Sequence, residues 1–279
     1  MLSVNPQSAP PPGTLPRVGL FVARHRRNSV VRKFAGLCRR FLSWYANVSY
    51  DIDHNGEGFV LDTLSGFKPK VILDVGANVG DWSLAAAQRC LSAQIHAFEI
   101  SPLTFEQLAG ATTSVGRIHP ESIGLSDNEG SVRIRHYDGL PALTTATEYP
   151  HPFPFTEISA KVTTGDSYAA SRGIEHIDLL KLDVEGMEHR VLKGFSGMLK
   201  RKAIDLVQFE YGRVSIVHGF LLRDFYTFFR ECGYVVGKVY PNYVDFRDYD
   251  LADEDFLGPN YLACRADRTN YLEALKRSA

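Results

Sequence analysis

The chain has 279 residues, of which 44% are hydrophobic, and a formal net charge of −1 at pH 7. This length suits one complete α/β domain with additions and leaves little room for two, and the nearly balanced charge gives no general attraction to nucleic acid. The four cysteines lie far apart without a C-x-x-C pair, so neither a zinc cluster nor a disulfide framework is expected. No apolar run approaches the roughly 20 residues that span a bilayer. We therefore expect a cytoplasmic protein, at most peripheral at a membrane.

The first fifty residues differ from the rest in charge. Residues 1–16 are proline-rich and polar, which is typical of a disordered tail. Apolar residues such as Phe34, Leu37 and Phe41 then recur at helical spacing, so we expect a basic helical extension over 17–68. Three roles stay open: packing on the domain, contact with an anionic membrane or lipid-linked polysaccharide surface, and an organelle transit peptide. No acidic residue precedes Asp51, and the basic residues are Arg17, Arg24, Arg26, Arg27, Arg32, Lys33, Arg39 and Arg40.

A buried strand is predicted at Val71–Val75, and it leads into a turn between Gly76 and Gly80 and then a helix. Asp81 or Ser83 is expected to cap or charge-complement the start of this helix. The dinucleotide fingerprint G-x-G-x-x-G requires a glycine where Asn78 stands, so a pyrophosphate cradle is disfavoured. The candidate cofactor-binding residues of this stretch are Asp74, Gly76, Ala77, Asn78, Gly80 and Trp82.

A second apolar strand, residues 94–100, carries Glu99 near its end. In doubly wound folds an acid at this place holds a ribose diol. Asp74 and Glu99 around a turn without the pyrophosphate pattern favour S-adenosylmethionine (SAM), which has a free ribose diol and an ammonium group.

Four stretches carry a resemblance to a known family: DVGANVGDW at 74–82, AFEISPLTFEQL at 97–108, IDLLKLDVEGMEHRVLKGF at 177–195 and VQFEYG at 207–212. They resemble the FkbM family of SAM-dependent methyltransferases. The resemblance implies a Rossmann-like class I methyltransferase fold at 69–268, with a C-terminal tail at 269–279. The expected sheet has seven mostly parallel strands ending in an antiparallel hairpin, Tyr234–Tyr240 with Asn260–Cys264, and helices on both faces. Further cofactor contacts are implied at Ile100, Ser122, Ile123 and Asp183.

The middle of the chain is less regular. Residues 117–126 are predicted as the third strand region, and Ser131–His136 as an edge strand of a hairpin. Residues 137–160 hold four prolines and are predicted to be irregular, a candidate substrate lid or a variable surface loop. Asp166 is expected to cap the helix before the fourth strand.

Charged residues cluster where the next two strands end. The predicted strand 177–184 contains Lys181, which needs a partner among Asp183, Glu185 and Glu210 because an unpaired buried ammonium is costly. Glu210 ends the following strand. The three acids could supply a general base for a hydroxyl, and Asp183 with Glu210 could instead bind a divalent cation. His218, in the loop after that strand, is a further candidate base.

We therefore expect an enzyme that methylates a hydroxyl of a sugar, polysaccharide or natural product, with SAM as cofactor and no nucleic acid partner. The catalytic candidates are Lys181, Asp183, Glu185, Glu210 and His218. The alternatives are an NAD(P)-dependent oxidoreductase and a SAM-binding protein without catalysis.

Overall fold

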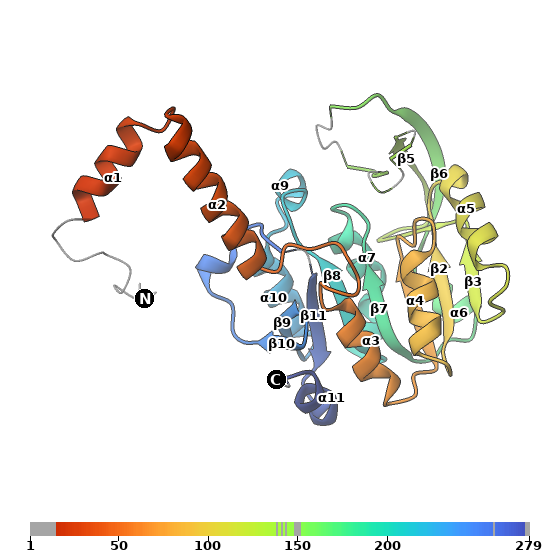
Figure 1. The fold of residues 1–279 in the computed structure, drawn as a ribbon. Coiled ribbons are helices and arrows are strands. Elements are labelled where there is room, and N and C mark those ends of the chain that lie inside the picture. Colours follow the sequence, from red (N-terminus) through yellow and green to blue (C-terminus); the bar gives the residue numbers. More distant parts are fainter. Residues whose placement is uncertain are drawn as a thin grey trace. The chain divides into compact units, whose positions relative to one another are not determined.

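The computed structural model describes residues 15–137, 139–140, 142, 144–147, 152–258 and 260–276, with side chains from residue 17 onward (Figure 1). It divides into two compact units, 1–46 and 47–279. The predicted N-terminal tail, residues 1–16, therefore lies outside the described residues, apart from Leu15 and Pro16, which begin the first helix.

The described part of the first unit, from residue 15 onward, consists of two helices. Helix α1 spans Leu15–Arg24 and α2 spans Ser29–Tyr45. The Asn28 side chain caps α2 by accepting a hydrogen bond from the backbone N–H of Val30 at 2.9 Å. The helical spacing of the sequence is thus confirmed, with a break between the two helices.

The second unit is built on an eight-stranded sheet with the order β10-β9-β11-β8-β7-β1-β2-β3. The five strands from β3 to β8 are parallel, and the three C-terminal strands are antiparallel to their neighbours. The strands are β1 (Val71–Val75), β2 (Gln94–Phe98), β3 (Ile118–Glu121), β7 (Ile177–Leu182), β8 (Ile204–Glu210), β9 (Tyr234–Tyr240), β10 (Tyr243–Phe246) and β11 (Asn260–Arg265).

This order confirms the predicted class I methyltransferase architecture. The antiparallel pair of β9 and β11 is the hairpin that the sequence predicted. The eighth strand, β10, was not predicted. Strand β10 follows β9 after a short turn, pairs antiparallel with it and forms one edge of the sheet. Aspartates in this stretch interrupt the alternation of apolar residues, so the sequence did not indicate a strand there.

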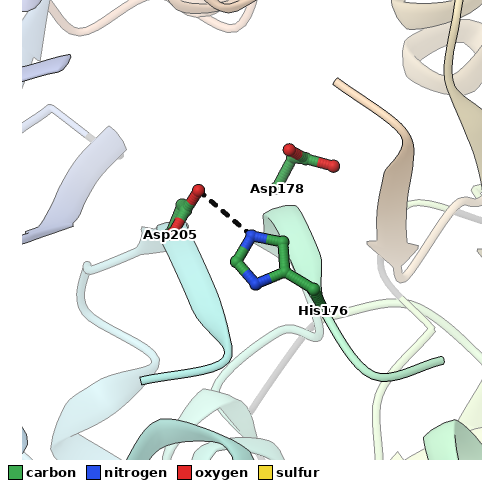
Figure 2. Close-up of side chains that lie close together, drawn as sticks. All are labelled: His176, Asp178 and Asp205. Carbon is green, nitrogen blue, oxygen red and sulfur yellow. Dashed lines mark ion pairs between the residues drawn. The ribbon is translucent and has the colours of Figure 1, made fainter. Parts of the chain in front are cut away.

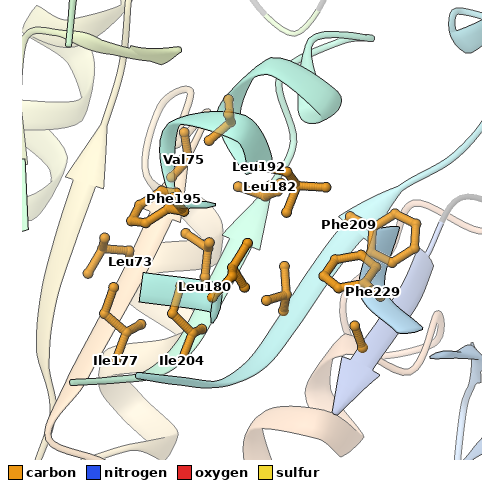
Figure 3. Packing of buried hydrophobic residues seen from close by; sticks show 14 of the residues in the cluster. Leu73, Val75, Ile177, Leu180, Leu182, Leu192, Phe195, Ile204, Phe209 and Phe229 are labelled. Carbon is orange, nitrogen blue, oxygen red and sulfur yellow. The ribbon is translucent and has the colours of Figure 1, made fainter. Parts of the chain in front are cut away.

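Helices cover both faces of the sheet (Figure 1), and each face has its own apolar core. One core packs Leu73, Leu180 and Phe209 of the sheet against Phe195 and Phe229 (Figure 3). Its helices are α6 (Gly165–Ser171), α7 (Glu188–Gly194), α8 (Ser196–Lys200) and α10 (Leu222–Glu231), with α9 (Ser215–His218) and the short 3-10 helix η2 (Leu251–Asp253) in connecting loops. The other core is formed by α3 (Glu57–Ser65), α4 (Asp81–Arg89), α5 (Pro102–Thr112) and α11 (Thr269–Leu275).

A second, three-stranded sheet has the order β4-β6-β5, formed by Gly124–Ser126, Thr156–Thr164 and Gly130–His136. The predicted third strand therefore divides, because β3 pairs with β2 whereas β4 pairs with β6. The irregular segment 137–160 is shorter than predicted, since β6 begins at Thr156 and pairs antiparallel with β5. Within that segment, residues 138, 141, 143 and 148–151 lie outside the described residues.

The structure differs from the predicted domain limits at both ends. Residues 47–68 belong to the second unit, because α3 buries Val60, Leu61 and Leu64 in its core. Helix α11 lies in the stretch predicted as a C-terminal tail and buries Tyr271 and Leu275 in the same core. Both segments lie outside the motifs that carried the resemblance.

Candidate active site

A cavity of about 260 Å³ lies at the carboxyl ends of β1, β2, β7 and β8. This is the edge where doubly wound sheets bind ligands. Glycine-turn residues contribute one part of its wall and acids from β7 and β8 another. The described lining residues are Tyr50, Asn55, Glu57, Val75, Gly76, Asn78, Phe98, Glu99, Ile100, Gly124, Leu125, Ser126, Val132, Ala142, Thr144, Thr145, Ala146, Val162, Asp183, Val184, Glu185, Met187 and Glu210.

The glycines of the turn are required by packing. Gly76 has φ +90°, and a Cβ atom there would lie 1.8 Å from the carbonyl oxygen of Asp183. Gly80, at φ +98°, precedes the first residue of α4. The close approach at Gly76 joins the end of β1 to the end of β7, so the turn places the two halves of the cavity side by side.

Asp74 lies beneath the cavity floor. Its carboxylate is fully buried and accepts a hydrogen bond from Ser83 Oγ at 2.7 Å. Burial raises its pKa. Gly80 is the N-cap residue of α4, and no side chain caps the helix, since Ser83 donates to Asp74. Asp81 lies in the first turn, where its charge complements the helix start as the sequence predicted. Asp74 therefore connects strand β1 to helix α4.

Lys181 is buried under the same floor. Its Nζ donates to Asp183 Oδ2 at 2.9 Å and lies 3.6 Å from Asp74 Oδ1. Burial would lower its pKa, but the nearby carboxylates of Asp183, Asp74 and Glu57 together raise it. Lys181 thus stays charged, and the partner that the sequence required is found in Asp183.

Glu99 is the acid at the ligand edge of β2. One carboxylate oxygen accepts from the backbone N–H of Ser101 at 2.7 Å and the other from that of Asn78 at 3.0 Å. Burial is the main cause that raises its pKa to about 7. The Asn78 side-chain oxygen is buried without a hydrogen-bond partner. Glu99 and Asn78 both line the cavity.

The acids of β7 and β8 lie together on the cavity wall. Burial, followed by the charge of Asp183, raises the pKa of Glu185 to about 8, and the same causes raise the pKa of Glu210 well above its ordinary value. The pKa of Tyr50, a residue that stays largely exposed, is also raised by partial desolvation and by these three carboxylates. The cavity therefore has a strongly acidic end.

His218 does not line this cavity. Its Nε2 lies 2.8 Å from Thr147 Oγ1, and that hydroxyl also lies 3.1 Å from the carbonyl oxygen of Glu185. Thr145 Oγ1 donates to the same carbonyl at 2.9 Å. Two threonines of the candidate lid therefore hold it to the loop after β7, and His218 supports this anchor.

Among the predicted cofactor and catalytic residues, the structure brings seven to the cavity: Gly76, Asn78, Glu99, Ile100, Asp183, Glu185 and Glu210. The described lining does not include Asp74, Ala77, Gly80, Trp82, Ser122, Ile123, Lys181 or His218. Gly124, Leu125 and Ser126 of β4 lie where Ser122 and Ile123 were expected.

Sequence reasoning missed one wall of the cavity. Tyr50, Asn55 and Glu57 come from the segment that precedes the motifs. Glu57 accepts from Gln208 Nε2 at 2.5 Å and from Asn55 Nδ2 at 2.8 Å. The available signal was Glu57 itself, an acid in the first turn of the helix Glu57–Ser65.

One group of possible metal ligands occurs among the described residues: His176, Asp178 and Asp205 (Figure 2). Asp205 already pairs with Arg265 at 3.0 Å and with Arg268 at 2.9 Å. Asp178 accepts two backbone N–H groups, of Lys70 and Val71. The group lies at the amino ends of β7 and β8, opposite the cavity, and its carboxylates are used in structural contacts.

Comparison with known proteins identifies the family. The profile of the methyltransferase FkbM domain matches residues 74–236, more than half of the chain. The chain belongs to the FkbM methyltransferase family. It is therefore a methyltransferase that uses SAM, which excludes the oxidoreductase alternative.

Two curated relatives and one solved structure illustrate the range of the family. The chain is 26% identical over 190 residues to the hexuronic acid methyltransferase AglP of Haloferax volcanii, covering 67% of this chain and 76% of AglP. It is 30% identical over 154 residues to the 31-O-demethyl-FK506 methyltransferase FkbM of Streptomyces tacrolimicus, covering 44% of this chain and 58% of that protein. A methyltransferase FkbM from Methylobacillus flagellatus matches with a TM-score of 0.45 and 15% identity, covering 70% of this chain and 44% of that one.

Proposed function

We propose that the chain is an O-methyltransferase that acts on a hydroxyl of a sugar, polysaccharide or natural product. The observation that carries this proposal is that one cavity holds both sets of predicted residues. Asn78 and Glu99 lie in it with Asp183, Glu185 and Glu210. A cofactor end and a proton-accepting end thus share one space.

The chemistry of the lining suits SAM. Glu99 offers carboxylate oxygens to a ribose diol, and the unpartnered side-chain oxygen of Asn78 can accept a further hydrogen bond. Bound there, SAM would supply the methyl group.

The protein's own contribution is to hold the acceptor hydroxyl and to take its proton. Asp183 is fixed by the charged Lys181 at 2.9 Å, so its carboxylate can orient the hydroxyl. Glu185, whose pKa is about 8, holds its own proton at neutral pH and can take the proton of the hydroxyl as the pH rises to 8 and above. Positioning of the reacting atoms would give most of the rate, up to about 7 to 11 kcal/mol of the barrier.

A carbohydrate is the preferred acceptor. One relative is a hexuronic acid methyltransferase, and another is a 31-O-demethyl-FK506 methyltransferase. Tyr50 adds an aromatic ring, 79% exposed, that lines the cavity near the acids. An exposed ring beside hydrogen-bond acceptors suits a sugar, which has both apolar faces and hydroxyl edges. A carbohydrate on a membrane-linked carrier would also suit the basic first unit.

The first test is isothermal titration with SAM and its demethylated product, with NADH as a control. Glu99→Gln should weaken SAM binding about tenfold, because it loses the charged acceptor, whereas Glu106→Gln, on the exposed side of α5, should not. Failure of the wild type to bind SAM would contradict the proposal.

The second test separates catalysis from binding. Asp183→Asn and Glu210→Gln should keep SAM binding and lose methyl transfer to acceptors from a panel of glycans and glycosides. Transfer that is unchanged in both variants would remove these carboxylates from the mechanism. SAM binding without transfer to any acceptor in the wild type would favour a non-catalytic protein.

A further inference from the structure

The two helices of the first unit expose an unusual amount of apolar surface. In α2 no residue is buried. Trp44 is 67% exposed, although tryptophan is usually covered. The other large apolar side chains exposed on the two helices are Val18, Leu20, Phe21, Val22, Val30, Phe34, Leu37, Phe41, Leu42 and Tyr45.

The apolar side chains of α2 share one side of the helix. At 100° per residue, positions 30, 34, 37, 41 and 45 follow one line along the axis, and positions 31, 38 and 42 widen it. The apolar sector thus covers about half of the circumference. Arg32 and Arg39 lie on the opposite side, and Lys33 and Arg40 flank the apolar sector.

Charge in this unit is entirely of one sign. Eight of the chain's 31 lysines and arginines lie in residues 1–46, and none of its 32 aspartates and glutamates does. The turn between the helices adds Arg26 and Arg27 to those of α2. A basic polar side next to a wide apolar side is typical of helices that lie in the interface of an anionic bilayer.

We propose that α1 and α2 form a surface that docks on an anionic lipid bilayer, with α2 lying in the plane of the interface. Phe34, Phe41 and Trp44 would enter the boundary between headgroups and acyl chains, while the arginines contact lipid phosphates. Among the described residues no helix is both long and apolar enough to cross a bilayer, so the helices lie on the surface. This inference goes beyond the proposed methyl transfer and does not depend on it.

A bilayer fits these helices better than a second copy of the chain or a nucleic acid. A paired helix of another copy would cover a narrow seam of one line of residues, whereas the apolar sector of α2 is about half of its circumference. A nucleic acid would contact the arginines and leave the aromatic residues in water. Only a lipid interface satisfies both sides of α2 at once.

The test uses the full-length protein and vesicles of phosphatidylcholine, with or without phosphatidylglycerol. Trp44 is a built-in reporter, because the other tryptophan, Trp82, is 8% exposed and lies in the core. Binding should move the emission of Trp44 to shorter wavelength, and cosedimentation should recover the protein with the anionic vesicles. Trp44→Phe should cosediment but lose the spectral change.

Matched variants separate the two parts of the surface. Arg39→Gln with Arg40→Gln should weaken binding to the anionic vesicles about fivefold per residue, and Phe34→Ser with Phe41→Ser should abolish the shift of Trp44. The matched controls are Lys193→Gln with Lys200→Gln and Leu91→Ser with Leu251→Ser, all exposed residues of the second unit. Each control should bind vesicles as the wild type does.

Three results would overturn the proposal. The first is no binding to anionic vesicles, and the second is equal binding of the wild type and the arginine variant. The third is a blue shift of Trp44 that depends on protein concentration without lipid, which would assign the apolar side to self-association. SAM titration of every variant verifies that the second unit is intact, so a failure of methyl transfer cannot produce any of these results.

Discussion

Glu185 makes the stability of the protein depend on pH. Burial, followed by Asp183, raises its pKa from 4.5 to about 8. Between these two values the unfolded chain has lost a proton that the folded protein still holds. The free energy of unfolding therefore falls as the pH rises through this window.

Glu185→Gln should remove this dependence. Between about pH 5 and pH 8, the stability of the variant relative to the wild type should rise by about 3 to 4 kcal/mol, measured by urea unfolding. Glu129→Gln, in the exposed turn before β5, is the control and should show no such gain. An equal change in both variants would contradict this account.

Gly76 is a second residue whose substitution should strongly affect stability. Gly76→Ala would place a Cβ atom 1.8 Å from the Asp183 carbonyl at a backbone angle that favours glycine. We expect about 3 kcal/mol of destabilisation or more, measured by thermal unfolding, and weaker SAM binding. Gly116→Ala, with no atom within 4 Å of its added Cβ, should be nearly neutral.

At the scale of elements, α3 is tied to the centre of the sheet through Glu57. The residue accepts hydrogen bonds from Gln208 of β8 and from Asn55. Glu57→Leu would leave both amide groups without this partner, so we expect a loss of about 2 kcal/mol in the free energy of unfolding. Asp62→Ala on the exposed side of α3 breaks only a surface ion pair with Arg89 and should cost less than about 1 kcal/mol.

The hydrogen bonds of Thr145 and Thr147, which hold the candidate lid to the loop after β7, are a second feature at this scale. Thr147→Val would remove the hydroxyl that contacts both the Glu185 carbonyl and His218. We expect faster amide hydrogen exchange in residues 144–147 with little change in the melting temperature, because this loop is at the low-stability end of the fold. Thr156→Val, at the exposed start of β6, should leave that exchange unchanged. Unaltered exchange in Thr147→Val would show that other contacts hold the loop.

At the scale of the whole molecule, the two units should differ in resistance to protease. Eight exposed lysines and arginines lie in the first unit, so limited trypsin should remove it before it cuts the packed second unit. Mass spectrometry would identify the products, and the remaining fragment should bind SAM as the full chain does. Early cleavage within 57–75 would contradict the division at residue 46.

The parts that the sequence predicted correctly depend on local patterns. The strand Val71–Val75, its glycine turn and the acid at Glu99 each lie within a few residues, and parallel strands bring their carboxyl ends to one edge. This is why Asn78, Glu99 and Asp183 reach the same cavity.

The missed parts depend on contacts between distant segments. Tyr50 and Glu57 reach the cavity only because α3 packs on the sheet. No periodic pattern of apolar residues near them in the sequence predicts this packing. Strand β6 was hidden behind Pro152 and Pro154, and its pairing with β5 is a long-range choice. His218 follows a strand that ends at the cavity, but it lies in α9, where its side chain contacts Thr147 of the candidate lid instead.

The position of β11 has a consequence for biosynthesis. It is made after every other strand of this sheet, yet it lies between β8 and β9. The sheet therefore cannot close while the ribosome is still adding these residues, and folding must finish after synthesis of the C-terminal segment. A nascent or shortened chain that lacks 260–265 presents two unpaired strand edges, so it should be a substrate for chaperones and prone to aggregation.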